Sequence, residues 1–107
     1  MAEQKLKKRV AVIGSGLGGL AAAIRLKVLG FHVDVFEQNE HPGGKAGEIR
    51  IDGFRFDTGP SLLTMPFVLS ELFEFCGENL VEYLELEKLN LLCKYFSPDS
   101  TILNAYS

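Results

Sequence analysis

The hydrophobic pattern of the first third of the chain changes from strand to helix and back to strand. The apolar run within 9–13 is typical of a short strand buried on both faces of a parallel sheet. Over 17–29, apolar residues recur every three or four positions, which predicts an amphipathic helix. Gly30 stands where helices commonly end in a left-handed residue. Because residues 31–37 alternate again, the pattern predicts a βαβ unit within about 30 residues.

Shorter elements follow this unit. Segments 48–51 and 54–56 flank Asp52-Gly53, a dipeptide favoured in two-residue hairpin turns, so they predict a β-hairpin. A second helix is expected to begin near Pro66, since proline fits a first helical turn, and to end at Gly77. Its apolar side is formed by Val68, Leu69, Leu72, Phe73 and Cys76.

The last third of the chain indicates a second hairpin. Residues 79–83 predict a helical turn, and the pattern in 84–92 and 94–96 is extended. The segment 97–100, Ser-Pro-Asp-Ser, is a turn, and 101–105 starts a returning strand. The expected class is therefore α/β, with a Rossmann-like βαβ unit, a hairpin, a helix and a further hairpin.

Composition limits the partners of the chain. With 107 residues, 47% of them apolar and 23% charged, it is at most one globular domain. A formal charge of -3 gives no general case for nucleic acid. The only basic run is at the start of the chain, where a solvated lead-in to the first strand is preferred and peripheral contact with anionic lipids is the alternative. The run consists of Lys5, Lys7, Lys8 and Arg9.

The cysteines and histidines point to neither a disulfide framework nor a metal site. Cys76 and Cys93 are too far apart for a Cys-x-x-Cys pair, and both are expected to be buried free thiols in a reducing cytoplasm. His32 and His41 have no cysteine or acidic cluster between them, so we expect no metal. No apolar run reaches the roughly 18 residues of a membrane span, and a signal-peptide core is absent, so we expect a cytoplasmic protein.

The turn after the first strand carries the clearest chemistry. It reads Gly14-Ser15-Gly16-Leu17-Gly18-Gly19, the Gly-x-Gly-x-x-Gly pattern between a strand and a helix. Gly14 permits the tight turn, Gly16 lets a pyrophosphate approach the backbone, and Gly19 lets the helix pack close to the strand. The helix N-terminus offers free N–H groups and a positive dipole end to the phosphates. This stretch predicts a dinucleotide site.

Glu37 ends the second predicted strand, about 20 residues after the glycines, where a carboxylate accepts hydrogen bonds from a ribose 2′-hydroxyl. A carboxylate repels a 2′-phosphate, so NADP is not expected. Without the glycines, a solvated strand end would be the preferred interpretation of Glu37. The glycines and Glu37 fit NAD and FAD alike.

Three later segments resemble a known group of flavoproteins. They are 41–47 (His-Pro-Gly-Gly-Lys-Ala-Gly), 54–61 (Phe-Arg-Phe-Asp-Thr-Gly-Pro-Ser) and 96–99 (Phe-Ser-Pro-Asp). With the first glycine turn, they resemble the FAD-dependent amine oxidase and phytoene desaturase superfamily, and within it the bacterial carotenoid desaturases. Taken alone, the glycines of 43–45 could form a flexible surface turn, and 57–60 a simple turn before a helix.

The resemblance implies FAD as the cofactor. It places the first glycine turn at the pyrophosphate, Glu37 at the adenosine ribose, Gly44 and Lys45 along the flavin phosphate and ribitol, and 59–61 near the isoalloxazine. The physical chemistry agrees, since glycines allow close approach and Lys45 offers charge to an anionic cofactor. The expected cofactor-binding residues are Gly14, Ser15, Gly16, Leu17, Gly18, Gly19, Glu37, Gln38, Gly44, Lys45, Gly59, Pro60 and Ser61.

Members of the group are several times longer, so the resemblance implies that 1–107 is the N-terminal part of an FAD/NAD(P)-binding Rossmann-like domain, without the substrate domain. The implied parent enzyme dehydrogenates a long polyene by hydride transfer to flavin, and no catalytic residue is identified here. Alternatives are an amine oxidase-like or retinol saturase-like flavoprotein, or a non-catalytic nucleotide-binding fragment. We expect self-association through exposed phenylalanines. These are Phe54, Phe56, Phe67 and Phe96.

Overall fold

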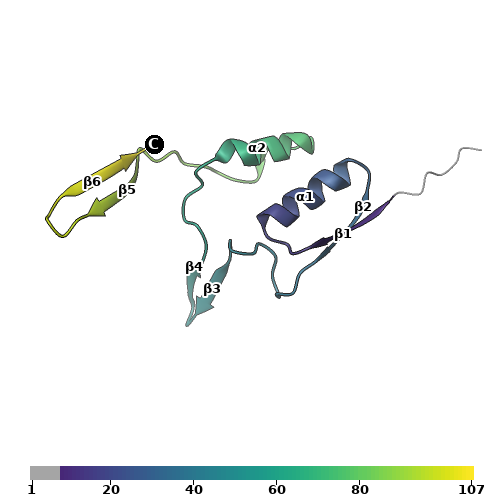
Figure 1. Cartoon of the computed structure of the whole chain (residues 1–107), viewed down its shortest axis with the longest axis horizontal. Coiled ribbons are helices and arrows are strands. Elements are labelled where there is room, and N and C mark those ends of the chain that lie inside the picture. The colour runs from purple at the N-terminus through teal and green to yellow at the C-terminus, as the bar shows by residue number, and fades with distance from the viewer. Residues whose placement is uncertain (1–7) are drawn as a thin grey trace, which may run out of the picture.

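The structure, a computed structural model, describes residues 8–107, so Lys5 and Lys7 of the basic run lie outside the described residues. These residues form three separate two-stranded sheets and two α-helices (Figure 1). The expected α/β class, with a βαβ unit, a hairpin, a helix and a second hairpin, is confirmed. The elements are β1 (Arg9–Ile13), α1 (Leu17–Val28), β2 (His32–Phe36), β3 (Glu48–Ile51), β4 (Phe54–Asp57), α2 (Pro66–Phe75), the 3₁₀ turn η1 (Leu80–Glu82), β5 (Leu91–Phe96) and β6 (Ile102–Tyr106).

The βαβ unit forms as its periodicity predicts. Strands β1 and β2 are parallel, with Val12 opposite Val35, and α1 connects them and packs against both. The Gly14 N–H donates to the Phe36 carbonyl at 2.7 Å, which continues the ladder into the glycine turn. Gly30 follows α1 with φ 92°, the left-handed conformation that glycine adopts at low cost.

The expectation that β1 is buried on both faces is wrong. Val10 and Val12 are partly buried, whereas Ile13 is 81% exposed. A Cβ built on Gly19 of α1 would lie 3.6 Å from Val12 Cγ1, so this face of the strand is the one that α1 covers. Among residues 8–107, no helix or strand covers the other face. The apolar run therefore indicated that both faces of the strand can be buried, but it did not show which elements cover them.

A small core forms where three helical elements meet. It consists of Ala23 of α1, Leu72 of α2 and Leu80 of η1, each less than a tenth exposed. Pro66 occupies the first turn of α2, and the left-handed Gly77 (φ 79°) follows the helix, both as expected. None of the helices in the described part of the chain is long and apolar enough to cross a lipid bilayer.

The two hairpins pair internally. In β3–β4, Asp52 (φ 51°) and Gly53 (φ 83°) form the expected two-residue turn with both residues left-handed. The second hairpin is shorter than expected, because β5 begins only at Leu91. Residues 84–90 were expected to be extended. The structure assigns none of them to a strand, and of these residues only Asn90 lies opposite the returning strand, where its carbonyl accepts from the Ser107 N–H at 3.2 Å.

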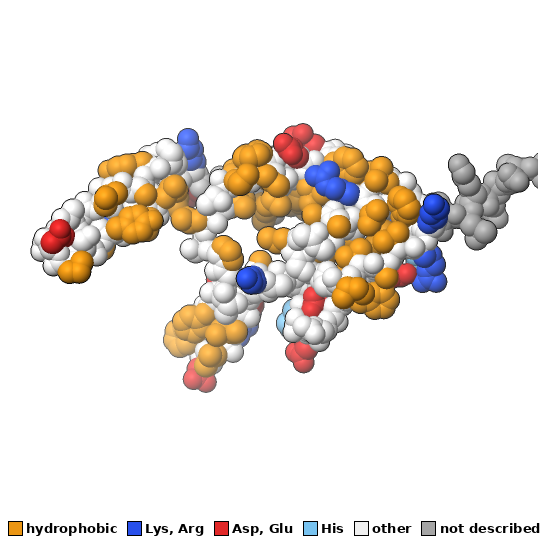
Figure 2. All heavy atoms as spheres, in the orientation of Figure 1, with side chains coloured by type: hydrophobic (Ala, Val, Ile, Leu, Met, Phe, Trp, Pro, Cys, Tyr) orange, Lys and Arg blue, Asp and Glu red, His pale blue; other side chains and the backbone are white. Residues whose placement is uncertain are grey.

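Both hairpins project away from the helices, and their apolar side chains are exposed (Figures 1 and 2). Neither hairpin contacts another helix or strand in the described residues. The radius of gyration is 19.6 Å, against about 13 Å for a compact domain of this length. Cys93, expected to be buried, is exposed on β5 for this reason, while Cys76 on α2 is partly buried; both are free thiols.

Candidate dinucleotide site

The glycine turn after β1 has the geometry that its spacing predicts. Gly14 has φ 93°, a conformation that residues with a side chain rarely adopt. A Cβ on Gly19 would overlap the carbonyl oxygen of Gly14, so α1 can approach the end of β1 only with glycine at this position. A Cβ on Gly18 would meet nothing within 4 Å, so the same turn is open on another side.

The N-terminus of α1 is only partly capped within the protein. Gly16 is the N-cap residue, with no side-chain cap, and the first turn contains no acidic residue. The helical ladder begins where Leu20 N–H donates to the Gly16 carbonyl at 2.9 Å. The N–H groups of Gly18 and Gly19 bond to no acceptor in the described residues. These groups and the positive end of the helix dipole fit an anionic pyrophosphate.

Glu37 lies beside this turn, directly after β2. Its Oε2 accepts hydrogen bonds from the backbone N–H and the Oγ of Ser15, both at 2.8 Å. Its Oε1 accepts from the backbone N–H of Asn39 at 3.0 Å and from Asn39 Nδ2 at 2.8 Å. The Asn39 backbone N–H, followed by the Ser15 donors, lowers the pKa of Glu37 to about 2. The carboxylate is therefore ionised near neutral pH.

The second glycine segment packs directly on the first turn. The Gly43 N–H donates to the Ser15 carbonyl at 2.8 Å, and Gly16 and Gly43 form a parallel β-bridge. Gly44 is left-handed (φ 61°), and a Cβ there would lie 3.0 Å from the Gly16 Cα. The loop 43–47 thus packs against the glycine turn instead of extending away from it as an isolated surface turn.

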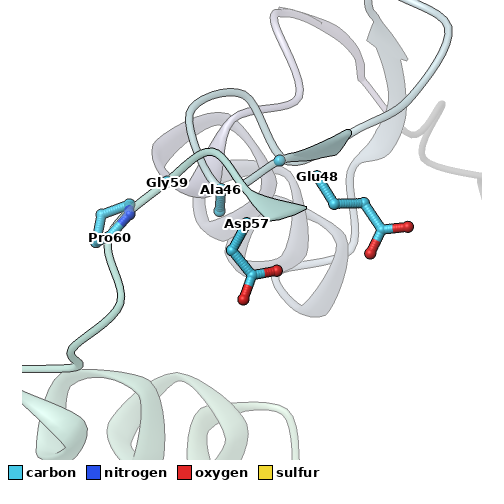
Figure 3. Close-up of a pocket in the computed structure, with 6 residues that line it drawn as sticks. Ala46, Glu48, Asp57, Gly59 and Pro60 are labelled. Atoms are coloured by element: carbon cyan, nitrogen blue, oxygen red, sulfur yellow. The ribbon is translucent and has the colours of Figure 1, made fainter. Parts of the chain in front are cut away.

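The third segment, after β4, joins the loop from its other side. A Cβ on Gly59 would overlap the Lys45 carbonyl oxygen, and Thr58 N–H donates to the Gly47 carbonyl at 2.9 Å. An open hollow of about 240 Å³ lies between the two segments (Figure 3). It is lined by Ala46, Gly47, Glu48, Asp57, Gly59 and Pro60.

The hollow and the glycine turn differ in the charged groups that lie at them. The carboxylates of Glu48 and Asp57, which face each other across the β3–β4 ladder, lie at the hollow (Figure 3). Arg50 donates to Glu48 at 2.7 Å and lowers the pKa of that carboxyl group. Arg55 also pairs with Glu48 at 3.5 Å and with Asp57 at 3.2 Å, so the charges at the hollow balance, whereas the end of α1 attracts an anion. A ligand that spans both places would therefore have an anionic part at the turn.

The structure brings most of the predicted positions to one end of the βαβ unit. The glycine turn, Glu37, Gly44, Gly59 and Pro60 meet there, while Gln38 and Ser61 are exposed and line none of these contacts. Lys45 contributes its backbone to the contact with Gly59. The ligand-binding roles of all these residues stay predictions.

Sequence reasoning missed Asn39 and the lining residues of the hollow. Asn39 stands two residues after the predicted ribose ligand, and short amide side chains commonly bond to groups two positions away. That spacing is the signal that could have identified it. The other missed residues are Ala46, Gly47, Glu48 and Asp57, which only the approach of two distant segments defines.

Comparisons with known proteins agree with this geometry. The chain is 43% identical over 101 residues to the 4,4'-diaponeurosporene oxygenases of Staphylococcus aureus strains USA300 and NCTC 8325. The matches cover 94% of this chain but 20% of each relative, so the chain spans about a fifth of their length. A solved structure, a CLA-producing fatty acid isomerase from P. acnes, superposes with a TM-score of 0.57 at 25% identity, covering 91% of this chain and 22% of that one.

The match to a family profile includes every element of the candidate site. Residues 12–78 match the NAD(P)-binding Rossmann-like domain. This segment begins inside β1 and ends after α2, so it contains the glycine turn, Glu37 and both later glycine segments. Together with the parallel β1–α1–β2 unit, the match establishes a dinucleotide-binding fold. The chain belongs to the family of NAD(P)-binding Rossmann-like domains.

Proposed function

We propose that this chain is the FAD-binding part of a flavin-dependent oxidoreductase. The observation that carries the proposal is the packing of loop 43–47 on the glycine turn through the Gly16–Gly43 bridge. An ordinary NAD-binding unit continues from its second strand into another helix and a third parallel strand. Here the chain returns across the phosphate-binding turn and enters a hairpin instead, as the resemblance to flavoproteins leads us to expect.

The described residues fit such a cofactor. The free N–H groups of Gly18 and Gly19 at the start of α1 would hold the pyrophosphate, and the ionised Glu37 would accept hydrogen bonds from ribose hydroxyls. Gly44 and Lys45 would bind along the rest of the cofactor, and 59–61 would lie toward its ring. Bound FAD would supply the redox chemistry, while the chain supplies orientation.

For the whole protein, we propose oxidation of a long apolar polyene, with desaturation as the first candidate reaction. Oxygenation is the second candidate, because the named relatives at 43% identity are 4,4'-diaponeurosporene oxygenases. Both reactions are compatible with the same cofactor part. An assay of a protein that contains this chain and a substrate domain, given phytoene or diaponeurosporene, separates them by mass: desaturation removes hydrogen, and oxygenation adds oxygen. Conversion of amines or retinoids instead would contradict the polyene proposal.

The cofactor is tested with the purified chain. We expect FAD to bind to the chain, with quenching of the FAD fluorescence. NADP added to this complex should leave the quenched fluorescence unchanged, because the carboxylate of Glu37 repels a 2′-phosphate and NADP therefore does not displace FAD. Gly44→Ala should weaken FAD binding at least tenfold, since it disturbs the contact with Gly16. Gly53→Ala is the matched control: it is also at positive φ, but in open space at the hairpin turn. Binding of NAD without binding of FAD would contradict the proposal.

Cytoplasmic location and contact of the basic run with anionic lipids stay predictions. Sedimentation of the chain with vesicles of anionic or neutral phospholipid tests the second. Binding to the anionic vesicles alone, reversed by salt, is the expected result if the run contacts lipid.

A further inference from the structure

The carboxylate of Glu37 is already fully hydrogen-bonded within the protein. An ionised carboxylate has about four lone-pair sites, and four donors occupy them: two backbone N–H groups and two side-chain groups. The backbone donors belong to Ser15 and Asn39, and the side-chain donors are Ser15 Oγ and Asn39 Nδ2. A ribose hydroxyl that bonds to Glu37 must therefore replace a donor that is present.

We propose that Ser15 Oγ and Asn39 Nδ2 occupy the places of two ribose hydroxyls, and that Glu37 exchanges these side-chain donors for the hydroxyls when the nucleotide binds. This inference rests on the proposed dinucleotide site and assigns a new role to each side chain. Both act as internal competitors of the ribose and so set the affinity of the site for it.

The two kinds of donor differ in freedom. Ser15 N–H lies in the glycine turn, which is held by the Gly43 N–H bond to the Ser15 carbonyl and by the bridge at Gly16. The Ser15 N–H therefore cannot leave without disturbing the turn, and the Asn39 N–H is fixed by the chain two residues from Glu37. The exposed Asn39 amide leaves by rotation of its side chain into solvent, whereas Ser15 is 3% exposed and its hydroxyl can only turn about χ1 within the glycine turn. Exchange thus spares the backbone.

The exchange also keeps the carboxylate satisfied throughout. Four donors surround it before binding, and two backbone donors plus two hydroxyls surround it afterwards. A buried or half-buried carboxylate that loses donors without replacement is costly. A 2′-phosphate brings acceptor oxygens and negative charge instead of a donor, so it cannot complete the exchange.

Removing a competitor should tighten ribose binding. A typical net hydrogen bond corresponds to a change in affinity of about three- to tenfold. Ser15→Ala and Asn39→Ala should each bind ADP tighter by about that factor, and one of the two gains, that of the side chain which the 2′-hydroxyl replaces, should be lost with 2′-deoxy-ADP. A merely structural role of either side chain would lower affinity for both nucleotides.

The test is an NMR titration of the ¹⁵N-labelled chain with ADP and with 2′-deoxy-ADP, for the wild type and both variants. Ser70→Ala and Asn104→Ala are the controls, because Ser70 Oγ bonds to Pro66 and Asn104 Nδ2 to Tyr106, far from Glu37 in the sequence. In the wild type, ADP should move the Asn39 Nδ2 proton resonances to the positions of a free amide. The backbone N–H of Asn39 should remain hydrogen-bonded.

Equal or weaker ADP binding by Asn39→Ala would overturn the inference, and so would an Asn39 amide resonance that ADP leaves unchanged. Since Asn39 is exposed, this variant keeps the test valid if Ser15→Ala disturbs the turn. ADP binding with these signatures but without FAD binding overturns only the proposed flavin function. FAD and ADP binding without exchange overturns only the inference. Failure of both nucleotides to bind overturns both.

Discussion

The β1–β2 pair and the β5–β6 hairpin are similar in size but opposite in environment. Each is a pair of short strands joined by hydrogen bonds. The parallel pair is linked by a 12-residue helix that covers one of its faces, whereas the hairpin contacts no other helix or strand within residues 8–107. Phe96 of the hairpin is 72% exposed. Hydrogen bonding alone therefore does not decide which pair is stabilised by burial.

The same difference explains where the site forms. Parallel strands end at the same edge, so the glycine turn after β1 and Glu37 after β2 become neighbours. An antiparallel hairpin joins its strand ends through a local turn and brings no distant segments together. The βαβ unit thus combines burial with the assembly of chemical groups, and the following predictions test that link.

Gly19→Ala should have the largest effect. Its Cβ would overlap the Gly14 carbonyl oxygen, so α1 must move away from β1. Overpacking of this kind costs about 1–3 kcal/mol or more in the free energy of unfolding. Urea unfolding followed by circular dichroism should show the loss, with weaker FAD binding beside it.

Gly18→Ala is the matched control for stability. Its Cβ meets nothing within 4 Å, and alanine has the higher helix propensity. We expect unchanged or increased stability, by up to about 1 kcal/mol. An equal loss in both variants would contradict the claim that close packing at Gly19 holds the unit together.

Gly59→Ala should separate cofactor binding from stability. The added Cβ would overlap the Lys45 carbonyl oxygen and push the third segment away from loop 43–47. FAD affinity, measured by fluorescence quenching, should fall about tenfold, because a displaced segment loses its contacts with the ligand. The unfolding midpoint of the helices should change little. An unchanged FAD affinity would show that the segment after β4 does not contribute to cofactor binding.

The exposed hairpins predict self-association of the chain. Phe54→Ser and Phe96→Ser together remove two large apolar groups from the tips and edges that contact no other element. Sedimentation velocity should show a several-fold weaker association than for the wild type. Val81→Ser, at a 74% exposed position outside the hairpins, should have little effect. A monomeric wild type at high concentration would contradict the prediction.

Acid should weaken the βαβ unit through Glu37, with a smaller effect. Its pKa is lowered from 4.5 to about 2 in the folded chain by hydrogen bonds from Asn39 and Ser15. A lowered carboxyl pKa adds stability that is complete above about pH 4.5 and is lost as the pH falls toward 2. The difference in unfolding temperature between wild type and Glu37→Gln should shrink across that range. Above about pH 4.5 the same difference should stay constant, and a difference that does not change over the whole range would contradict the prediction.

Local chemistry made most elements predictable. Gly30, Gly77 and the Asp52-Gly53 turn lie at the ends and turns that their conformations favour, and all adopt positive φ. The local pattern over 84–92 did not reveal where the paired strand begins, because a strand needs a partner and the pattern does not show whether one is present. The prediction that Cys93 is buried was wrong for a similar reason. Apolar neighbours along the chain do not cover a hairpin that packs against no other element.

The order of residues by itself determined the βαβ unit and the glycine turn, because periodicity and glycine stereochemistry act over a few residues. Only the tertiary structure decided that loop 43–47 packs on this turn, that Gly59 packs on the loop, and that Ser15 bonds to Glu37. These contacts depend on the path of the backbone between the segments. The sequence shows which glycines permit close approach of the backbone. Which segments pack against them is determined only by the folded path of the chain.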